Sequence, residues 1–306
     1  MRRAAGNELS MRRCPSCRSL CALPFPSPEE LAAYYNSDYS VIDAGLTPRR
    51  RANWTPLLEK AERLAGLRNG IEIGSSTGAF LRLATERGWT MAGVELDARA
   101  RQAHARTSPD IPVRATVEAA REAGIDHADA AWVLHTIEHL PDPEAVLRET
   151  LDLMTPGAPI AVTTPNGMSL ECRVLGPLWE WWTPPAHLTL FSPRGACLLL
   201  ERAGFEIVSV ETRRGDSSGA AANAALAPAR FLKRRLRGER QQRSSVSSVT
   251  QRVAACINLL YDPISNPLRG RLYRHHQGPE LVIVARRPGP RTNRPDGLET
   301  MGEAAR

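Results

Sequence analysis

The sequence of 306 residues predicts an α/β fold, built on a doubly wound and mainly parallel sheet with helices on both faces. Three observations support this prediction. Short apolar segments alternate with segments of helical periodicity between residues 70 and 164. Two of the apolar segments, DAAWVL and PIAVTT, are continuous, as expected for strands buried on both faces. A turn with two glycines in GIEIGSSTG, residues 70–78, joins the first of these strands to a helix, where open α/β sheets bind ligands.

The individual elements follow from periodicity and from punctuation by glycine and proline. Seven strands are expected, at residues 70–74, 90–95, 111–115, 129–134, 158–164, 205–212 and 279–288. Helices are expected at residues 29–36, 49–67, 77–87, 97–106, 117–123, 143–154 and 192–203. Residues 1–28 show no regular pattern and are predicted to be irregular, and a loop with clustered tryptophans is expected after residue 165.

The chain is predicted to divide into a main domain with flanking segments. Residues 1–47 form a Cys-containing segment with a linker helix, and residues 48–288 form the main domain. A basic helical insert at residues 213–278 precedes the last strand, and the polar residues 289–306 are expected to be a disordered tail.

The basic charge of the chain is concentrated in that insert. The net charge is +7, but residues 213–276 alone carry 13 Lys and Arg against three acidic residues, so the rest of the chain is slightly acidic. Residues 224–261 contain basic amphipathic helices. Two interpretations of these helices are open. They form a lid or an oligomer contact with a solvated basic face, or they bind peripherally to an anionic membrane. Nucleic acid is not favoured because no aromatic stacking motif accompanies the charge. The oligomeric state is left undetermined.

Composition narrows the cellular setting. No run of 18 apolar residues exists, and the first residues, MRRAAGNELSMRR, lack the apolar stretch of a signal peptide. The six cysteines are unevenly spread, which favours reduced thiols over a disulfide framework. We therefore expect a cytoplasmic protein. Residues 224–261 leave open the alternative that it binds peripherally to the inner face of the membrane.

The turn at residues 74–78 fits neither common phosphate-binding loop. Ser76 and Ala79 stand where a dinucleotide fingerprint needs glycines, and no Gly-Lys-Ser/Thr follows for a P-loop. Glu95 ends the second strand, 21 residues after Gly74, where a carboxylate can accept the ribose hydroxyls of an adenosine. Glu72 lies inside the first strand, where a carboxylate needs backbone amides or a cation. An adenosine that carries positive charge and no phosphate, such as S-adenosylmethionine, satisfies both acids.

Several motifs, in order, resemble the class I S-adenosylmethionine-dependent methyltransferases. IEIGSSTGAFL resembles the first motif of that family, GVELDARAR its acidic second motif, and DAAWVLHTIEHLPDPEAVLRETLDLMTPGAPIAVTTPN its fourth-to-fifth strand region. PPAHLTLFSPRGACLLLERAGFEIV resembles the segment before the sixth strand, in the branch with an N-terminal Cys-containing segment. The resemblance covers roughly residues 12–212 and 279–288. It implies a Rossmann-like sheet of seven strands with the last strand antiparallel, and S-adenosylmethionine as the cofactor.

The resemblance also implies roles for individual positions. The residues expected around the cofactor are Glu72, Gly74, Ser76 and Gly78 at the methionine end, Glu95 at the ribose, Leu96 and Val117 near the adenine, and Leu134 and His135 under the sulfonium. Ser76 replaces the middle glycine of the family. Tyr34, Tyr35 and Tyr39 of the linker helix region are expected near the acceptor.

Three histidines are candidates for the catalytic base. Methyl transfer is a displacement on an activated methyl group, so a base is needed only if the acceptor must lose a proton. His135 and His139 follow the fourth strand, and His187 lies in the segment expected to cover the acceptor. For each of them, a structural histidine bonded to backbone or to a carboxylate such as Glu138 is the alternative. The tryptophans expected to wall the acceptor, or to pack as a lid, are Trp179, Trp181 and Trp182.

No metal site is predicted. Cys14 and Cys17 have zinc-knuckle spacing, but a closed structural zinc site takes four ligands and the chain lacks a second pair. The sequence thus predicts an S-adenosylmethionine-dependent methyltransferase for a small-molecule, sugar or lipid-like acceptor. The alternative is a non-catalytic adenosine-cofactor binding module with a basic membrane- or partner-binding surface. The sequence does not identify the acceptor or the atom that is methylated.

Overall fold

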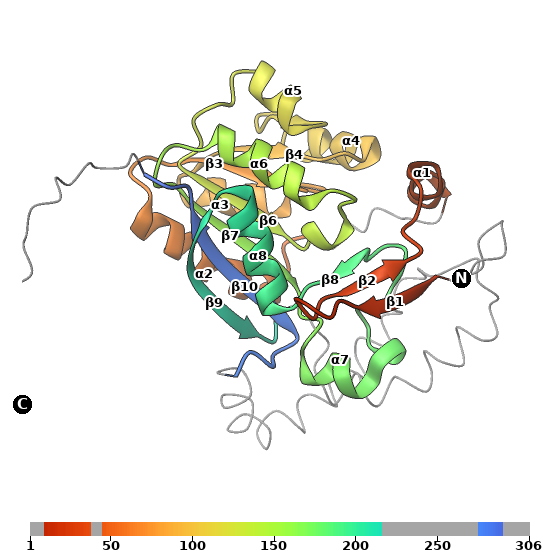
Figure 1. Cartoon of the computed structure of the whole chain (residues 1–306). Coiled ribbons are helices and arrows are strands. Elements are labelled where there is room, and N and C mark those ends of the chain that lie inside the picture. The colour runs from red at the N-terminus through yellow and green to blue at the C-terminus, as the bar shows by residue number, and fades with distance from the viewer. Residues whose placement is uncertain (1–8, 38–44, 216–274, 290–306) are drawn as a thin grey trace, which may run out of the picture.

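The computed structural model describes residues 9–37, 45–215 and 275–289 (Figure 1). Its main sheet has seven strands in the order β5-β4-β3-β6-β7-β10-β9. The strands are β3 (Asn69–Ile73), β4 (Thr90–Val94), β5 (Val113–Arg114), β6 (Ala130–Leu134), β7 (Pro159–Pro165), β9 (Glu206–Arg213) and β10 (Glu280–Arg286). All neighbours pair in parallel except β10, which is antiparallel to both β7 and β9. The predicted Rossmann-like sheet, with its last strand antiparallel, is confirmed.

Helices cover both faces of this sheet. They are α2 (Pro48–Leu64), α3 (Ala79–Glu86), α4 (Ala98–Thr107), α5 (Val117–Glu122), α6 (Pro143–Leu153) and α8 (Pro193–Ala203). Two further helices, α1 (Pro28–Ser37) and α7 (Leu170–Leu175), lie beside the N-terminal strands instead (Figure 1). Side-chain caps define several helix starts: Thr116 accepts a bond from Ala119 N, Asp142 from Ala145 N and Ser192 from Gly195 N. Proline at the first helical position reinforces α2, α6 and α8.

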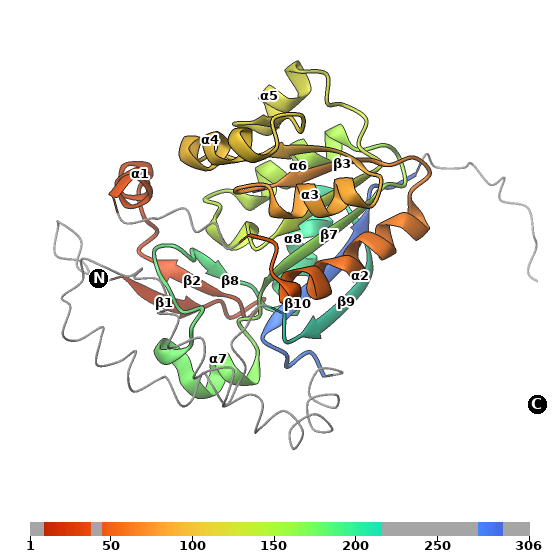
Figure 2. The ribbon, with the colours of Figure 1, turned by 180° about the vertical axis from the view of Figure 1, so that it is seen from behind.

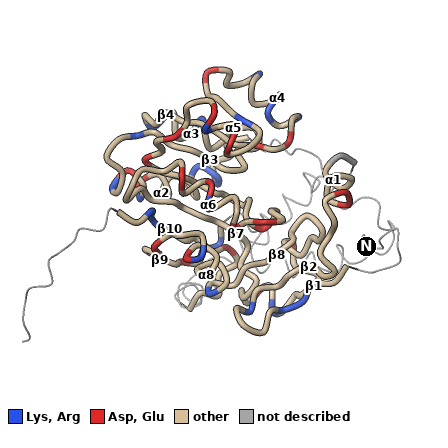
Figure 3. Tube along the Cα trace, turned by 45° about the horizontal axis from the view of Figure 1, so that its top comes forward, with Lys and Arg blue, Asp and Glu red and all other residues tan. Residues whose placement is uncertain are grey.

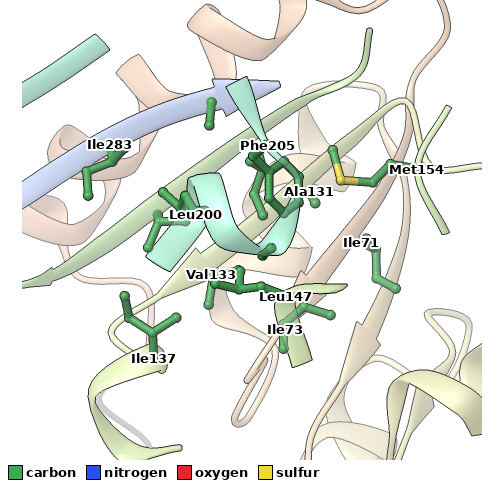
Figure 4. Packing of buried hydrophobic residues seen from close by; sticks show 14 of the residues in the cluster. Ile71, Ile73, Ala131, Val133, Ile137, Leu147, Met154, Leu200, Phe205 and Ile283 are labelled. Atoms are coloured by element: carbon green, nitrogen blue, oxygen red, sulfur yellow. The ribbon is translucent and has the colours of Figure 1, made fainter. Parts of the chain in front are cut away.

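The strand period of two divides the core into two layers. On β6, Ala131 and Val133 face one cluster, which also contains residues of α5, α6 and α8. Trp132 and Leu134 face the other cluster, with α2 and α3. Figure 4 shows the first cluster, and Figures 1 and 2 show the two helix layers from opposite sides. Each fully buried large apolar side chain stabilises the fold by about 1.5–3 kcal/mol.

The prediction that residues 1–28 are irregular is wrong. Two strands, β1 (Ser10–Arg13) and β2 (Leu20–Leu23), form an antiparallel hairpin, which pairs with β8 (Thr189–Leu190) in a small second sheet (Figure 1). The strands are too short to give a periodic signal, and they form because the backbone of a distant segment completes their hydrogen bonding. The loop expected after residue 165 contains α7 and the 3₁₀ turn η2 (Gly176–Leu178) as well.

The parts of the chain for which helices and a tail were predicted from charge and composition lie mostly outside the described residues. These are the core of the basic insert with the amphipathic region at 224–261, and residues 290–306 of the tail. Within the described residues, Lys and Arg are interspersed with Asp and Glu along the chain (Figure 3). Among the helices described, none is long and apolar enough to span a membrane.

Candidate functional site

The strand order reverses at β3, which lies between β4 and β6. In an open α/β sheet such a switch point opens a crevice at the carboxyl ends of the strands. Two chain segments meet there: the turn after β3, which holds Gly74, and the segment after β6, which holds Thr136 and the 3₁₀ turn η1 (Ile137–His139). They are in direct contact, because a Cβ added at Gly74 would lie 2.2 Å from Oγ1 of Thr136.

The two glycines of the turn are required by the protein itself. Both have a positive φ of 79°, a conformation that L side chains rarely adopt. A Cβ at Gly78 would lie 2.1 Å from Nδ1 of His104, just as Thr136 fills the space beside Gly74. The space that a side chain at Gly74 or Gly78 would occupy is therefore filled by Thr136 or His104. A ligand could approach the turn only at the backbone atoms that these side chains leave exposed.

Ser76 also adopts a left-handed conformation, with φ of 49°. A serine can take this conformation at a cost that glycine does not pay. Its backbone N–H donates to Oε2 of Glu95 at 2.8 Å, and Asp97 N–H donates to Oε1 at 2.8 Å. Glu95 thus ties the turn after β3 to the end of β4. Burial raises the pKa of the Glu95 carboxyl, against the opposing effect of these amide bonds.

Glu72 is buried inside β3, and its Oε2 atom has no hydrogen-bond partner. Burial, with a contribution from the negative charge of Glu95, raises the pKa of Glu72 well above its ordinary value. A buried carboxyl in this state gains free energy from a cation placed beside it. The expectation, made from the sequence, that a positively charged ligand lies near the turn stays a prediction.

The other residues expected around the cofactor lie in different surroundings. Leu96 follows β4 and is 78% exposed, so its side chain is open to a ligand. Val117 is 3% exposed and packs in the core cluster under α5, which leaves little of its side chain to contact an adenine. Leu134 ends β6 and packs with α2 and α3, with 8% of its surface exposed.

His135 is held between two buried carboxylates. Its Nε2 lies 2.5 Å from Oε1 of Glu280 on β10, and its Nδ1 lies 3.5 Å from Oε1 of Glu138. Burial opposes the charged imidazolium, but the two carboxylates outweigh burial and raise the pKa of His135 to about 10. Arg213 makes an ion pair with the other oxygen of Glu280. His135 therefore keeps its proton near neutral pH, and this arrangement suits an ion-pair anchor better than a base.

His139 and His187 lie beside each other, with ring centroids 4.7 Å apart. Nδ1 of His139 is 2.7 Å from the carbonyl oxygen of Ala186, and Nδ1 of His187 is 2.6 Å from that of Trp181. A carbonyl only accepts, so in both rings Nδ1 carries the hydrogen. Burial, together with the neighbouring His139, lowers the pKa of His187 to about 3, so its ring is neutral and its Nε2 holds a lone pair.

Glu138 was named from the sequence only as a structural partner of the histidines, and not as a site residue. It is fully buried, its Oε2 accepts a hydrogen bond from Thr164 at 2.9 Å, and its Oε1 has no hydrogen-bond partner. Burial alone would raise its pKa, but His135, His139 and His187 lower the pKa to about 2. An acid that directly precedes a histidine at the carboxyl end of an apolar strand was the available signal. The partner Glu280, in PELVIVA, had none beyond being an acid at the start of an apolar strand.

Of the three tryptophans, Trp181 makes ring contacts with the histidines. Trp181 stacks on His135, with centroids 5.3 Å apart, and on His187, with centroids 5.9 Å apart. Trp179 is fully buried in a small core with Leu20, and both Trp181 and Trp182 pack against the same core. Trp181 therefore contacts both the histidines and the packed core, and an aromatic wall for the acceptor stays a prediction.

Tyr34 and Tyr35 of the linker helix make packing and backbone contacts. Tyr34 is 5% exposed and packs edge-on against Tyr35. The carbonyl oxygen of Tyr35 accepts a bond from Arg99 on α4, which fastens α1 to the side of the sheet that carries Glu95. Tyr39 lies outside the described residues.

The N-terminal hairpin supports the segment that carries His187. Ser19 Oγ accepts the backbone N–H of Ser192 at 3.1 Å, and Ala22 N–H donates to the carbonyl oxygen of Leu188 at 2.8 Å. Cys14, Cys17 and Cys21 are free thiols. Within the described ranges they belong to no group of three side chains close enough to hold a metal ion.

Comparison with known proteins gives one family. A family model described as "Methyltransferase domain" matches residues 47–210, which is more than half of the chain. The "Ubiquinone biosynthesis O-methyltransferase" of Escherichia coli is 28% identical over 145 residues, which cover 44% of this chain and 60% of that protein. The chain spans half to 60% of the length of such curated relatives.

Solved structures share the fold at lower identity. The cyclase SpnF superposes with a TM-score of 0.50 at 18% identity, over 81% of this chain and 84% of its own. A "SAM dependent methyltransferase" from Archaeoglobus fulgidus has a TM-score of 0.46 at 19% identity, over 76% of this chain and 94% of its own. SpnF is a cyclase, so the shared fold by itself does not define the reaction.

Proposed function

This chain belongs to the class I S-adenosylmethionine-dependent methyltransferases, and from that premise we propose that it methylates a hydroxyl group of a small-molecule acceptor. The observation that carries the proposal is the pair of carboxylates at the switch point, Glu72 and Glu95. Two acidic side chains on adjacent strands, one inside β3 and one just after β4, disfavour the pyrophosphate of a dinucleotide and favour a ligand that carries an ammonium and a sulfonium, because a cation stabilises the ionised form of each carboxyl. The choice of oxygen is supported by the O-methyltransferases among the relatives.

The residues present fit this cofactor. The unpartnered Oε2 of buried Glu72 would gain a cationic partner. Each oxygen of Glu95 accepts one backbone N–H, and a carboxylate oxygen can accept a second bond, so the ribose hydroxyls can bind without displacing the turn. Exposed Leu96 offers an apolar surface for the adenine. S-adenosylmethionine, when bound, supplies a methyl group activated by its sulfonium.

The acceptor side is assigned to the segments after β6 and before β8. In methyl transfer, the acceptor oxygen forms a bond to the methyl carbon as the carbon–sulfur bond breaks, and the hydroxyl proton must leave. Of the three predicted bases, His135 is occupied by Glu280, whereas His139 and His187 each have Nδ1 fixed by a carbonyl. Their Nε2 atoms are therefore the groups we assign to the acceptor hydroxyl. Trp181 would exclude water beside them.

The test has a binding step and a turnover step. Thermal unfolding is measured with S-adenosylmethionine, S-adenosylhomocysteine and a nicotinamide dinucleotide. A ligand at 100 times its dissociation constant stabilises the folded state by about 2.7 kcal/mol. Stabilisation by the two adenosyl ligands alone is expected, and stabilisation by the dinucleotide alone would contradict the proposal. Transfer of labelled methyl to a catechol, a monophenol or an aliphatic alcohol then tests the acceptor. Transfer confined to amines would exclude a hydroxyl.

A further inference from the structure

The side chains of Glu138, His139 and His187 converge beside the proposed acceptor position. One ligand atom from each lies within 4.8 Å of those of the other two. Glu138 and His139 belong to the turn η1 after β6, whereas His187 precedes β8. A backbone bond joins the two segments, because Leu188 N–H donates to the carbonyl oxygen of Glu138 at 2.8 Å. The cluster is therefore held by main chain as well as by side chains.

Both imidazoles are oriented in the way that metal-binding histidines are. Such histidines generally donate the second ring N–H to a carbonyl or carboxylate, which fixes the tautomer and turns the other nitrogen to the ion. His139 donates from Nδ1 to Ala186, and His187 donates from Nδ1 to Trp181. Nε2 is left in each ring as the atom with a lone pair to offer.

Glu138 supplies the third donor. Its Oε2 is engaged by Thr164, but its buried Oε1 has no hydrogen-bond partner, and Nδ1 of His135 lies 3.5 Å from this oxygen. That imidazole makes its short contact with Glu280 instead, at 2.5 Å. Glu138 can therefore bind a second cation while His135 retains its own carboxylate. A fully buried carboxylate oxygen without a partner is costly, and coordination of an ion would remove that cost.

We propose that Glu138, His139 and His187 bind a divalent metal ion of the kind that imidazole and carboxylate ligands share, with zinc as the type case. The inference rests on the proposed function in one respect, namely that an acceptor hydroxyl, or water in its absence, completes the coordination. The ion would then hold both Nε2 atoms and would itself lower the pKa of the bound hydroxyl, in place of a free imidazole base. Three protein ligands with an open position are the pattern of catalytic rather than structural zinc sites. Zinc–nitrogen bonds of about 2.0–2.1 Å place tetrahedral ligand atoms roughly 3.3 Å apart, so the three side chains would draw together from their separation of up to 4.8 Å when an ion binds.

The test uses the full chain, stripped of metal by chelator and titrated with Co²⁺, whose visible absorption reports coordination geometry and ligand type. One equivalent with the intense absorption of a four- or five-coordinate site is expected, followed by its displacement by Zn²⁺. Glu138→Gln, His139→Gln and His187→Gln are each expected to weaken Co²⁺ binding by about 100-fold or more, since even indirect partners of a metal contribute 10- to 100-fold. His127→Gln, at an 81% exposed side chain, is the matched control.

Two measurements separate the possible outcomes. Thiolate-to-metal absorption in the near ultraviolet, lost in a Cys14→Ser/Cys17→Ser double variant, would assign the ion to the cysteines and overturn the proposal. Absence of Co²⁺ binding by the unsubstituted protein would overturn it as well, whether or not the variants fold. S-adenosylhomocysteine binding is measured on the same samples. If the protein binds S-adenosylhomocysteine but no metal, the metal site is overturned and the proposed methyl transfer stands. If it binds metal but no S-adenosylhomocysteine, the metal site stands and the proposed methyl transfer is overturned.

Discussion

The turn after β3 and the histidine cluster after β6 lie at the same edge of the sheet but are specified in different ways. The turn is local: Gly74, Ser76 and Gly78 adopt positive φ within five residues, and Glu95 binds the amide of Ser76 from the adjacent strand. The cluster is assembled from distant segments, with His135 and Glu280 separated by 145 positions. Under the proposed function the first region binds the cofactor and the second acts on the acceptor, so substitutions in the two regions should affect different measured quantities.

The largest expected effect is on turnover, in the histidine cluster. His187→Gln should lower kcat by about 10²- to 10⁴-fold, the contribution typical of a group that assists proton removal. Affinity for S-adenosylhomocysteine should stay within twofold, because the hydrogen bond and ring contacts of His187 are made with Trp181 and His139. Steady-state kinetics and calorimetry check the two quantities, and His127→Gln serves as the control. Equal losses of kcat and cofactor affinity would mean that the two regions are not separable.

The next effect is on stability, at the contact between the two regions. Gly74→Ala should lower the free energy of unfolding by about 2–5 kcal/mol, because backbone strain at positive φ adds to a clash with Thr136. Gly157→Ala is the matched control. It has φ of 83° and nothing within 4 Å of the added Cβ, so it should cost only the strain of about 1–2 kcal/mol. Urea denaturation compares the two variants, and equal costs would show that Thr136 moves aside freely.

A smaller effect is expected on cofactor affinity alone. Glu95→Gln should weaken S-adenosylhomocysteine binding by about 1–3 kcal/mol, the range for a lost charged hydrogen bond. Once the cofactor saturates the enzyme, kcat should change little. Glu86→Gln, in an exposed ion pair at the end of α3, is the control for loss of a carboxylate. Calorimetric titration of both variants measures the difference, and an unchanged affinity would remove Glu95 from the cofactor site.

The buried acid of β3 should make cofactor binding depend on pH. The pKa of Glu72 is raised in the free protein, and a bound cation lowers it again, so binding releases a proton below the raised pKa. Affinity for S-adenosylmethionine should therefore rise with pH above the ordinary carboxyl value, by at most tenfold per unit, and level off above the raised pKa. Titrations below pH 7 keep the amino group of the ligand protonated, so its titration does not contribute to the slope. Glu72→Gln should remove the slope, and a slope that persists would point to another group.

The smallest expected effect concerns the N-terminal hairpin. Ser19→Ala removes the acceptor for Ser192 N–H, a buried bond contributing about 1 kcal/mol. The expected result is a reduced kcat with unchanged cofactor affinity, because the hairpin supports the segment of His187 and not the turn after β3. Ser10→Ala, on the outer strand of the same hairpin, is the control. A change in cofactor affinity alone would contradict this assignment.

Most of the fold could be predicted because its signals are local. Strand β3 begins and ends one residue from its predicted bounds, and β6 begins one residue inside them, since continuous apolar runs between glycine and polar residues admit few alternatives. The hairpin β1–β2 could not be predicted, because strands of four residues carry no periodic signal and depend on β8, which is far away in the sequence. The loop position of Ser76 was identified as unusual, and its left-handed backbone gives the reason.

For the site, the sequence by itself determined which residue types stand at the ends of the strands, because the fold repeats a known order of strands and turns. Only the tertiary structure decided what each of them does. His135, His139 and His187 are the same side chain, yet two carboxylates hold a proton on the first, while backbone carbonyls leave a lone pair on each of the others. The protonation and the coordinating ability of a side chain depend on burial and on neighbouring charges, and these arise only when distant segments come together.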